Sequence, residues 1–247
     1  MWFRNLQLYR LIETFEYSPE SLHAALLARV FKPCAGLDSY SMGWAPPAGR
    51  ETSQLVHACN GRIMLCLRRE DRILPAAVIR EHVEEKAEAI TQAESRPLGR
   101  KEKQQLKEDV IVDLLPRAFT RSTHMFAYID PVERWVVVDS ATPKKAEELL
   151  SALRETLGSL RLKPLAVNNA PTSVLTRWLE DTMPAGFELG DECELKEPVD
   201  QGGVMRGRRM DLASAEVKSH LDAGMQVSKL AVEWQERIGC ISVSYTH

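Results

Sequence analysis

Residues 96–121 read RPLGRKEKQQLKEDVIVDLLPRAFTR, and the rest of the chain is organised around this stretch. It opens with a Pro-Gly break and a basic cluster, turns apolar in its middle, and closes with the segment PRAFTR. Leu106, Val110 and Leu114 recur at the spacing of one face of a helix. The pattern therefore predicts a helix that begins after the break and ends near Pro116.

The charges of this predicted helix are sorted by face. At about 100° per residue, Glu102, Asp109 and Asp113 fall in one narrow sector. Lys103 and Lys107 lie on the opposite side, in line with the apolar stripe. Two interpretations stay open, a solvated amphipathic helix or a basic surface displayed at the end of a structural arm. For the second interpretation the candidate DNA contacts at this basic end are Arg96, Arg100, Lys101, Lys103 and Lys107.

A second helix is predicted upstream of the break. From Pro75 onward, apolar residues recur on one face as far as Ala93, and the Arg96–Gly99 segment ends the pattern. Two long helices joined by a short basic loop form a helical hairpin. We expect this hairpin, residues 75–121, to project from the body of the protein.

Strands arranged in hairpins dominate the remaining sequence. Asn60-Gly61 between two apolar runs is the strongest short-range hairpin signal, and Ser18-Pro19 is typical of a helix start. Residues 31–49 are rich in Pro and Gly and are predicted to be mainly loop. Together these patterns predict an α+β fold with antiparallel sheets built from hairpins and interspersed single helices. We divide the chain into an N-terminal α+β part (1–74), the helical hairpin (75–121) and a second α+β part (122–247).

Composition limits the possible classes of protein. The chain has 247 residues, 44% of them hydrophobic and 27% charged, with a formal net charge of −3. These proportions are ordinary for a soluble globular protein. The N-terminus carries charges too early for the apolar core of a signal peptide, and no apolar run is long enough for a membrane span. We expect a cytoplasmic protein with no membrane partner. Any surface for nucleic acid must arise from segregation of charge, because the chain has no excess of basic residues.

The five cysteines give no framework for disulfides or zinc. They are odd in number, scattered and never in CxxC spacing. We expect reduced thiols, with Cys59 and Cys66 at buried positions of the predicted hairpin.

A search for catalytic motifs nominates no enzyme. The sequence lacks GxxxxGK[ST], GxGxxG after a strand, HExxH and GxSxG, and its six histidines are isolated. We therefore expect no catalytic residue, no metal and no cofactor. One alternative is a metal-dependent DNA hydrolase in which Asp109 and Asp113 hold the ion.

Basic residues outside the opening helix supply further candidates for DNA contact. Three arginines lie within four residues in the segment VMRGRRM, and repulsion between them favours the presence of an anion. In a strand, Arg206 and Arg208 share one face while Arg209 points to the other. The other basic candidates are Arg117 and Arg121, which flank Phe119, and Lys229 in a predicted strand. Few exposed aromatic residues are interleaved with these cations, which favours contact with a duplex backbone over stacking on single strands.

Several blocks carry a resemblance to a known family: WFRNLQLYRL, MGWAPPAGR, NGRIMLCLRREDRILPAAVI, KEKQQLKEDVIVDLLPRAFTR, KKAEELLSALRETLGSL, GGVMRGRRMDL and VSKLAVEWQERI. In order and extent they resemble the RdgC family of bacterial recombination-associated proteins. The resemblance implies a nucleoid-associated protein that binds double-stranded DNA with little sequence preference. It also implies a closed homodimeric ring that encircles the duplex and limits access of RecA recombinase.

The resemblance also assigns roles to individual positions. Arg117 and Phe119 match family positions tied to DNA binding and to ring integrity, so Phe119 is a candidate dimer contact. Arg209 matches a basic position implicated in DNA contact, whereas Met210 stands where the family often has glutamine. Family members continue beyond the segment that matches WQERI, and residues 241–247 do not resemble that continuation. If the continuation supports a dimer contact, ring closure is expected to be weaker in this chain.

The leading hypothesis is a non-catalytic, sequence-independent DNA-binding homodimer that acts in recombination and replication fork repair. Besides the hydrolase, a second alternative is a protein-interaction module that contacts recombinase directly through the helical hairpin.

Overall fold

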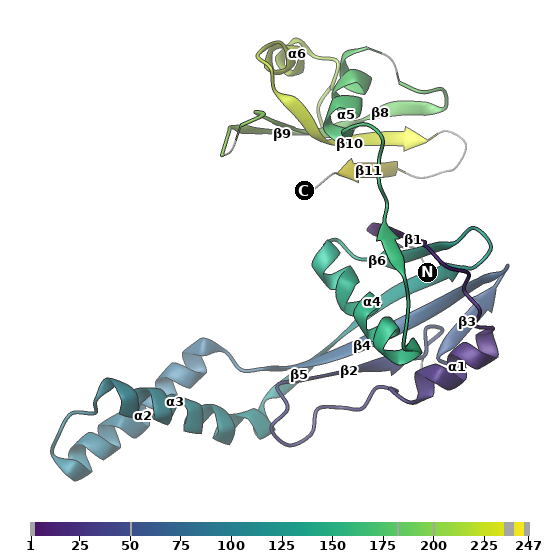
Figure 1. The fold of residues 1–247 in the computed structure, drawn as a ribbon. Helices are drawn as coiled ribbons and strands as arrows, with labels where there is room; N and C mark the ends of the chain where they lie inside the picture. The colour runs from purple at the N-terminus through teal and green to yellow at the C-terminus, as the bar shows by residue number, and fades with distance from the viewer. Residues whose placement is uncertain (1–2, 50, 182, 200, 235–239, 245–247) are drawn as a thin grey trace. The chain divides into compact units, whose positions relative to one another are not determined.

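A computed structural model describes residues 3–49, 51–181, 183–199, 201–234 and 240–244. The chain forms two compact units, residues 1–165 and residues 166–247 (Figure 1). Both units combine antiparallel sheets with helices, so the predicted α+β class is confirmed. The predicted boundaries at 74/75 and 121/122 fall inside the first unit, and that three-part division stays a prediction.

The first unit is built on a seven-stranded antiparallel sheet. Its main path runs β2-β4-β5-β6-β1-β7, and β3 pairs with β4 beside this path. Each pairing between these strands is antiparallel. The strands are β1 Leu6–Leu11, β2 Tyr40–Ala45, β3 Val56–Cys59, β4 Arg62–Ile73, β5 Phe119–Asp130, β6 Trp135–Asp139 and β7 Leu162–Pro164.

The predicted hairpin is the junction of β3 and β4. Asn60 and Gly61 connect the strands with φ angles of 50° and 76°. Positive φ at both central residues is the requirement of the turn that matches the right-handed twist of paired strands. The Asn-Gly prediction is therefore confirmed.

Two helices, α1 (Pro19–Leu27) and α4 (Pro143–Leu157), contribute to the core of this unit. The Ser18 side chain accepts a hydrogen bond from the Ser21 backbone N–H, which confirms the predicted start of α1. Leu149 and other fully buried residues of α4 pack with alternate residues of the central strands in one hydrophobic cluster. One face of the sheet thus supplies the core.

The stretch that organises the sequence lies between β4 and β5. It contains α2 (Ala76–Glu94), α3 (Arg100–Leu114) and the short 3-10 helix η1 (Leu115–Arg117). Leu106 and Val110 are buried, as the helical spacing predicts, and Lys86 Nζ lies 2.6 Å from Asp113 Oδ2 across the two helices. The helical part ends near Pro116, as predicted, and β5 begins at Phe119 and pairs with β4 from its first residue. Residues 119–121, which close the stretch, are thus strand.

The second unit contains a four-stranded antiparallel sheet in the order β11-β10-β8-β9. Leucines and valines of this sheet form a second core with residues of α5 and α6. Its elements are α5 Pro171–Glu180, β8 Phe187–Lys196, β9 Val204–Arg208, α6 Ala215–Asp222, β10 Gln226–Trp234 and β11 Cys240–Ser244.

One local prediction is incomplete and one is wrong. Residues 31–49 are mainly loop, as predicted, but they also contain β2, which pairs with β4 along its length and buries Trp44. Tertiary pairing here overrides the Pro and Gly content of the flanking segments. Cys66 is buried as expected, but Cys59 is exposed because it is the last residue of β3, beside the turn. Within the described ranges, no helix is both long and apolar enough to cross a bilayer.

Candidate nucleic-acid interface

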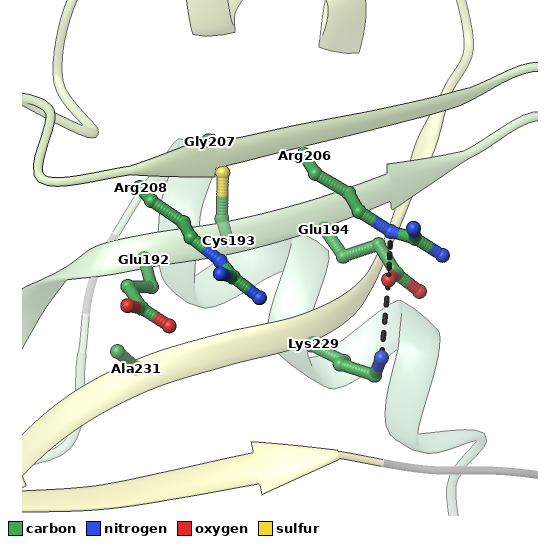
Figure 2. A pocket seen from close by; sticks show the side chains of 8 residues that line it. All are labelled: Glu192, Cys193, Glu194, Arg206, Gly207, Arg208, Lys229 and Ala231. Carbon is green, nitrogen blue, oxygen red and sulfur yellow. Dashed lines mark hydrogen bonds and ion pairs between the residues drawn. The ribbon is translucent and has the colours of Figure 1, made fainter.

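Three of the predicted cations meet in a shallow hollow of the second unit. Arg206 and Arg208 of β9 and Lys229 of β10 line a space of about 320 Å³ on the sheet (Figure 2). Glu192 and Glu194 of β8 lie between them. Arg206 and Arg208 project to the same side in Figure 2, as strand alternation predicts.

Strand register explains why residues distant in sequence come together here. Glu192 lies opposite Arg208 and Glu194 opposite Arg206, while Lys229 lies opposite Glu194 from the other side. Opposite residues in an antiparallel pair share a face, so opposite charges are paired across the sheet. The central strand thus supplies acids and its two neighbours supply bases.

Glu194 is the anion at the centre of this cluster. It is only 4% exposed, and its carboxylate accepts hydrogen bonds from Arg206 Nε at 2.8 Å, Ser228 Oγ at 2.9 Å and Lys229 Nζ at 3.0 Å. Lys196 Nζ is 3.7 Å away. Burial alone would raise the pKa of Glu194, but the hydrogen bonds from Lys229, Arg206 and Ser228 outweigh it and lower the pKa to about 2. The carboxylate is therefore ionised at neutral pH.

The cations around Glu194 keep much of their surface open to solvent. The side chain of Arg206 is 68% exposed and that of Lys229 is 44% exposed. Because Arg206 bonds to Glu194 through Nε and its side chain is largely exposed, its two terminal nitrogens are left to meet another anion. A fixed guanidinium with an exposed fork is suited to a phosphate group.

Gly207 separates the two arginines and faces the helix-covered side of the sheet. A Cβ on Gly207 would lie 2.1 Å from the sulfur of Met210, which packs against the second core. Glycine here leaves room for Met210 while the strand continues to Arg208. Met210 thus has a packing role at the position where a glutamine would offer a hydrogen bond.

Arg209 lies just beyond this arrangement. The strand β9 ends at Arg208, and Arg209 is exposed with a φ of 52°. The alternation that predicted its direction therefore stops before this residue.

The basic cluster at the start of α3 is partly neutralised within the chain. Arg96 donates two hydrogen bonds to Glu102, at 2.6 and 2.9 Å, and its Nη2 lies 2.7 Å from Glu94. Hydrogen bonds from Arg96 and from the Gly99 backbone N–H lower the pKa of Glu102 to about 2. Arg100, Lys101, Lys103 and Lys107 are exposed. Lys103 also lines a hollow of about 380 Å³ between α2 and α3.

The closing segment of this stretch is exposed. Arg117 is the last residue of η1, and Phe119, the first residue of β5, is 85% exposed. Arg121 is also exposed and lies opposite Asp71 of β4. With this exposure, Phe119 is not part of the hydrophobic core of its unit.

The two acids of the hydrolase alternative are engaged elsewhere. Asp113 is paired with Lys86, and Asp109 accepts a hydrogen bond from Gln105 at 3.1 Å. Among the residues that the structure describes, no group of three or more His, Cys, Asp or Glu is placed to hold a metal ion.

The predicted basic residues thus divide between the units. Arg206, Arg208 and Lys229 meet in one hollow of the second unit, whereas the candidates from Arg96 to Arg121 belong to the first. Sequence reasoning missed Glu192, Glu194 and Ser228. Alternating acids in the segment DECELK indicate a polar strand face, but only the pairing of β8 with β9 and β10 identifies the partners.

Comparison with known proteins identifies the family. The model of the family described as "Putative exonuclease, RdgC" matches residues 1–243. The recombination-associated protein RdgC of Tolumonas auensis is 41% identical over 242 residues, which cover 98% of this chain and 80% of the relative. That of Aeromonas hydrophila is 42% identical with the same coverage. That of Salmonella typhimurium is 42% identical over 239 residues, 96% of this chain and 79% of the relative. With a match of this identity along nearly all of its length, the chain belongs to the RdgC family.

Proposed function

We propose that this protein binds duplex DNA through phosphate contacts and without reading its sequence. The observation that carries the proposal is the hollow lined by Arg206, Arg208 and Lys229, in which Arg206 and Lys229 are held by the buried carboxylate of Glu194. The exposed fork of Arg206 is held in place before any ligand arrives, so little side-chain freedom is lost on binding. Phosphate contacts of this kind attract any duplex equally.

The protein acts in this proposal as a homodimeric ring in the nucleoid of the bacterial cytoplasm. A closed ring around the duplex stays on the DNA because it cannot leave sideways, so its individual contacts with phosphates can be weak. By occupying DNA it limits access of RecA recombinase during recombination and replication fork repair. The names of the relatives place them in recombination, and the basic hollow agrees with a DNA partner.

Contact between copies is assigned to the region around Phe119. Its side chain lies opposite Ile73 in the register of β4 and β5, and both residues are exposed. Exposed neighbouring apolar side chains mark a surface that another protein can cover. In the same proposal α2 and α3 form the projecting helical hairpin of each subunit.

A salt titration tests duplex binding. The logarithm of the binding constant should fall linearly with the logarithm of salt concentration, by about 0.9 per phosphate contacted. Replacing Arg206, Arg208 and Arg209 by alanine should flatten this slope. Replacing the exposed Lys144, Lys145 and Lys218 by alanine removes the same charge elsewhere and should leave the slope nearly intact. Equal slopes for wild type and the arginine variant would exclude those arginines from the interface.

A nuclease is the second candidate, because the matching family carries the word exonuclease in its description. Incubation of the protein with end-labelled duplex and Mg²⁺ separates the two functions. If the wild type releases the end label and an Asp109→Asn/Asp113→Asn variant does not, the nuclease is favoured. DNA that stays intact over hours favours binding without cleavage.

A protein-interaction module is the third candidate, and it draws on α2. None of the 19 residues of this helix is buried, so its surface is available to a partner. If α2 contacts recombinase directly, inhibition of recombinase should survive the arginine replacements. Loss of inhibition together with DNA binding would contradict direct contact.

A further inference from the structure

One face of the seven-stranded sheet lies opposite the core. Tyr9 of β1 and Val136 of β6 are buried in the cluster that contains α4. Side chains alternate along a strand, so the next residues, Arg10 and Trp135, point to the opposite face. Sequence reasoning had assigned no function to this face.

A row of polar and aromatic residues crosses this face. Arg10 lies opposite Trp135 of β6 on one side and opposite Lys163 of β7 on the other. Trp135 in turn lies opposite Asp130 of β5, whose carboxylate accepts a hydrogen bond from Arg62 Nε of β4 at 2.9 Å. With about 4.8 Å between neighbouring strands, the row is about 19 Å long.

The row is positively charged although the chain as a whole is negative. Arg10 and Lys163 are exposed, and the side chain of Arg62 is 54% exposed. Asp130 is the one acid of the row, and it is buried and already paired with Arg62. Two cations in excess therefore face solvent side by side, which favours an anionic ligand.

Aromatic side chains lie within and beside the row. The Arg10 guanidinium is 4.7 Å from the centre of the Trp135 ring. Tyr128 and Phe126 occupy the next two positions of β5 on the same face, and Phe3 contacts Tyr128 with ring centres 5.5 Å apart. The four rings, those of Trp135, Tyr128, Phe126 and Phe3, are all partly exposed. Alternate residues of a strand are about 7 Å apart, so successive rings can meet different bases.

We propose that this sheet face binds a single-stranded polynucleotide, with phosphates on Arg10, Lys163 and Arg62 and unpaired bases on Trp135 and Tyr128. Cations beside partly exposed rings on a sheet face match the two requirements of such a ligand, which are charge along its backbone and stacking on its bases. A duplex satisfies only the first requirement, because its bases are stacked on one another. The surface is distinct from the hollow around Glu194, so this inference goes beyond the proposed function and does not depend on it.

Fluorescence anisotropy with labelled oligo-dT and with a duplex of equal length tests the proposal. In an Arg10→Ala/Lys163→Ala variant the salt slope for oligo-dT should fall by up to about 1.4, since each phosphate contact of a single strand contributes about 0.7. A Trp135→Leu variant keeps an apolar side chain but loses stacking, and its affinity for oligo-dT should fall about fivefold or more. Lys144→Ala/Lys145→Ala, on α4, is the charge-matched control and should bind oligo-dT like the wild type.

The outcomes separate the two proposals. The wild type could fail to bind duplex while the Arg10/Lys163 and Trp135 variants still weaken oligo-dT binding. That result would refute only the proposed function. The sheet-face proposal is refuted if the wild type does not bind oligo-dT, or if the Arg10/Lys163 and Lys144/Lys145 variants lose it equally. It is also refuted if the Arg10/Lys163 variant changes only the oligomeric state in light scattering, because the face would then be an interface between copies. Thermal unfolding of each variant verifies that the loss is not one of folding.

Discussion

Replacement of Glu194 by glutamine tests whether the carboxylate aids DNA binding by holding Arg206 and Lys229 in place or opposes it by repelling phosphates. The change removes one negative charge from the hollow while keeping the size of the side chain. If charge alone governed DNA binding, the variant would bind more tightly, because a repulsive group beside the phosphates is gone. We expect weaker binding, since the carboxylate holds Arg206 and Lys229 in place at 2.8 and 3.0 Å.

The same replacement should destabilise the fold. A shift of the Glu194 pKa from 4.5 to about 2 corresponds to about 3 kcal/mol, and solvent around the exposed ends of Arg206 and Lys229 reduces this to about 1–2 kcal/mol. The folded-state pKa lies below the unfolded value, so this stability is complete above about pH 4.5 and is lost as the pH falls toward 2. The difference in unfolding free energy between wild type and variant should therefore shrink across that range.

Urea unfolding at pH 7 and pH 3.5, with anisotropy of labelled duplex at pH 7, measures both effects. Glu192→Gln is the matched control, because Glu192 lies on the same face but is exposed. It makes the same change in charge and should alter the unfolding free energy by less than about 0.5 kcal/mol. Tighter duplex binding by the Glu194 variant, with stability like that of the Glu192 variant, would refute a positioning role for the carboxylate.

Three further predictions concern the first unit. Leu149→Ala should lower the unfolding free energy by about 2–5 kcal/mol in urea titrations, because this α4 side chain is fully buried; a loss below 1 kcal/mol would contradict the packing described. Cys59 should react quickly with a thiol reagent at pH 8, and the fast fraction should shrink in Cys59→Ser. Cys66 should react only on unfolding, since burial raises its pKa to about 12, and rapid labelling of Cys66 in the native protein would oppose this. Phe119→Asp should leave the unfolding free energy of a single subunit within about 0.5 kcal/mol while weakening self-association in light scattering; an unchanged association constant would remove Phe119 from the dimer contact.

Local signals in the sequence predicted much of the fold. Asn60-Gly61 located the β3–β4 turn, and Ser18-Pro19 located the start of α1, because each encodes a backbone geometry that few other residues provide. Residues 119–121 were included in the helical hairpin, because the long pairing with β4 that makes them strand is not visible in local propensity.

The candidate site was harder to predict. The sequence shows basic residues at 206, 208 and 229, which lie on β9 and β10. It does not show that Glu194, which holds two of them, comes from a third strand, β8. The sheet-face row joins Arg10 to Trp135 and Lys163, which are far apart in sequence. Only strand register reveals such a row, and periodicity within one strand carries no information about register between strands.

The long β4–β5 pair has a consequence for how the protein folds. Its first contact, Ile73 with Phe119, closes a loop of about 45 residues, and each doubling of loop length adds about 0.6 kcal/mol of entropic cost. Compared with a four-residue turn, this closure costs about 2 kcal/mol more. If α2 and α3 associate first, they hold the two strand ends near each other and remove most of that cost. Association of α2 with α3 thus brings β4 and β5 together during folding. Weakening the Lys86–Asp113 contact should therefore slow refolding more than it speeds unfolding.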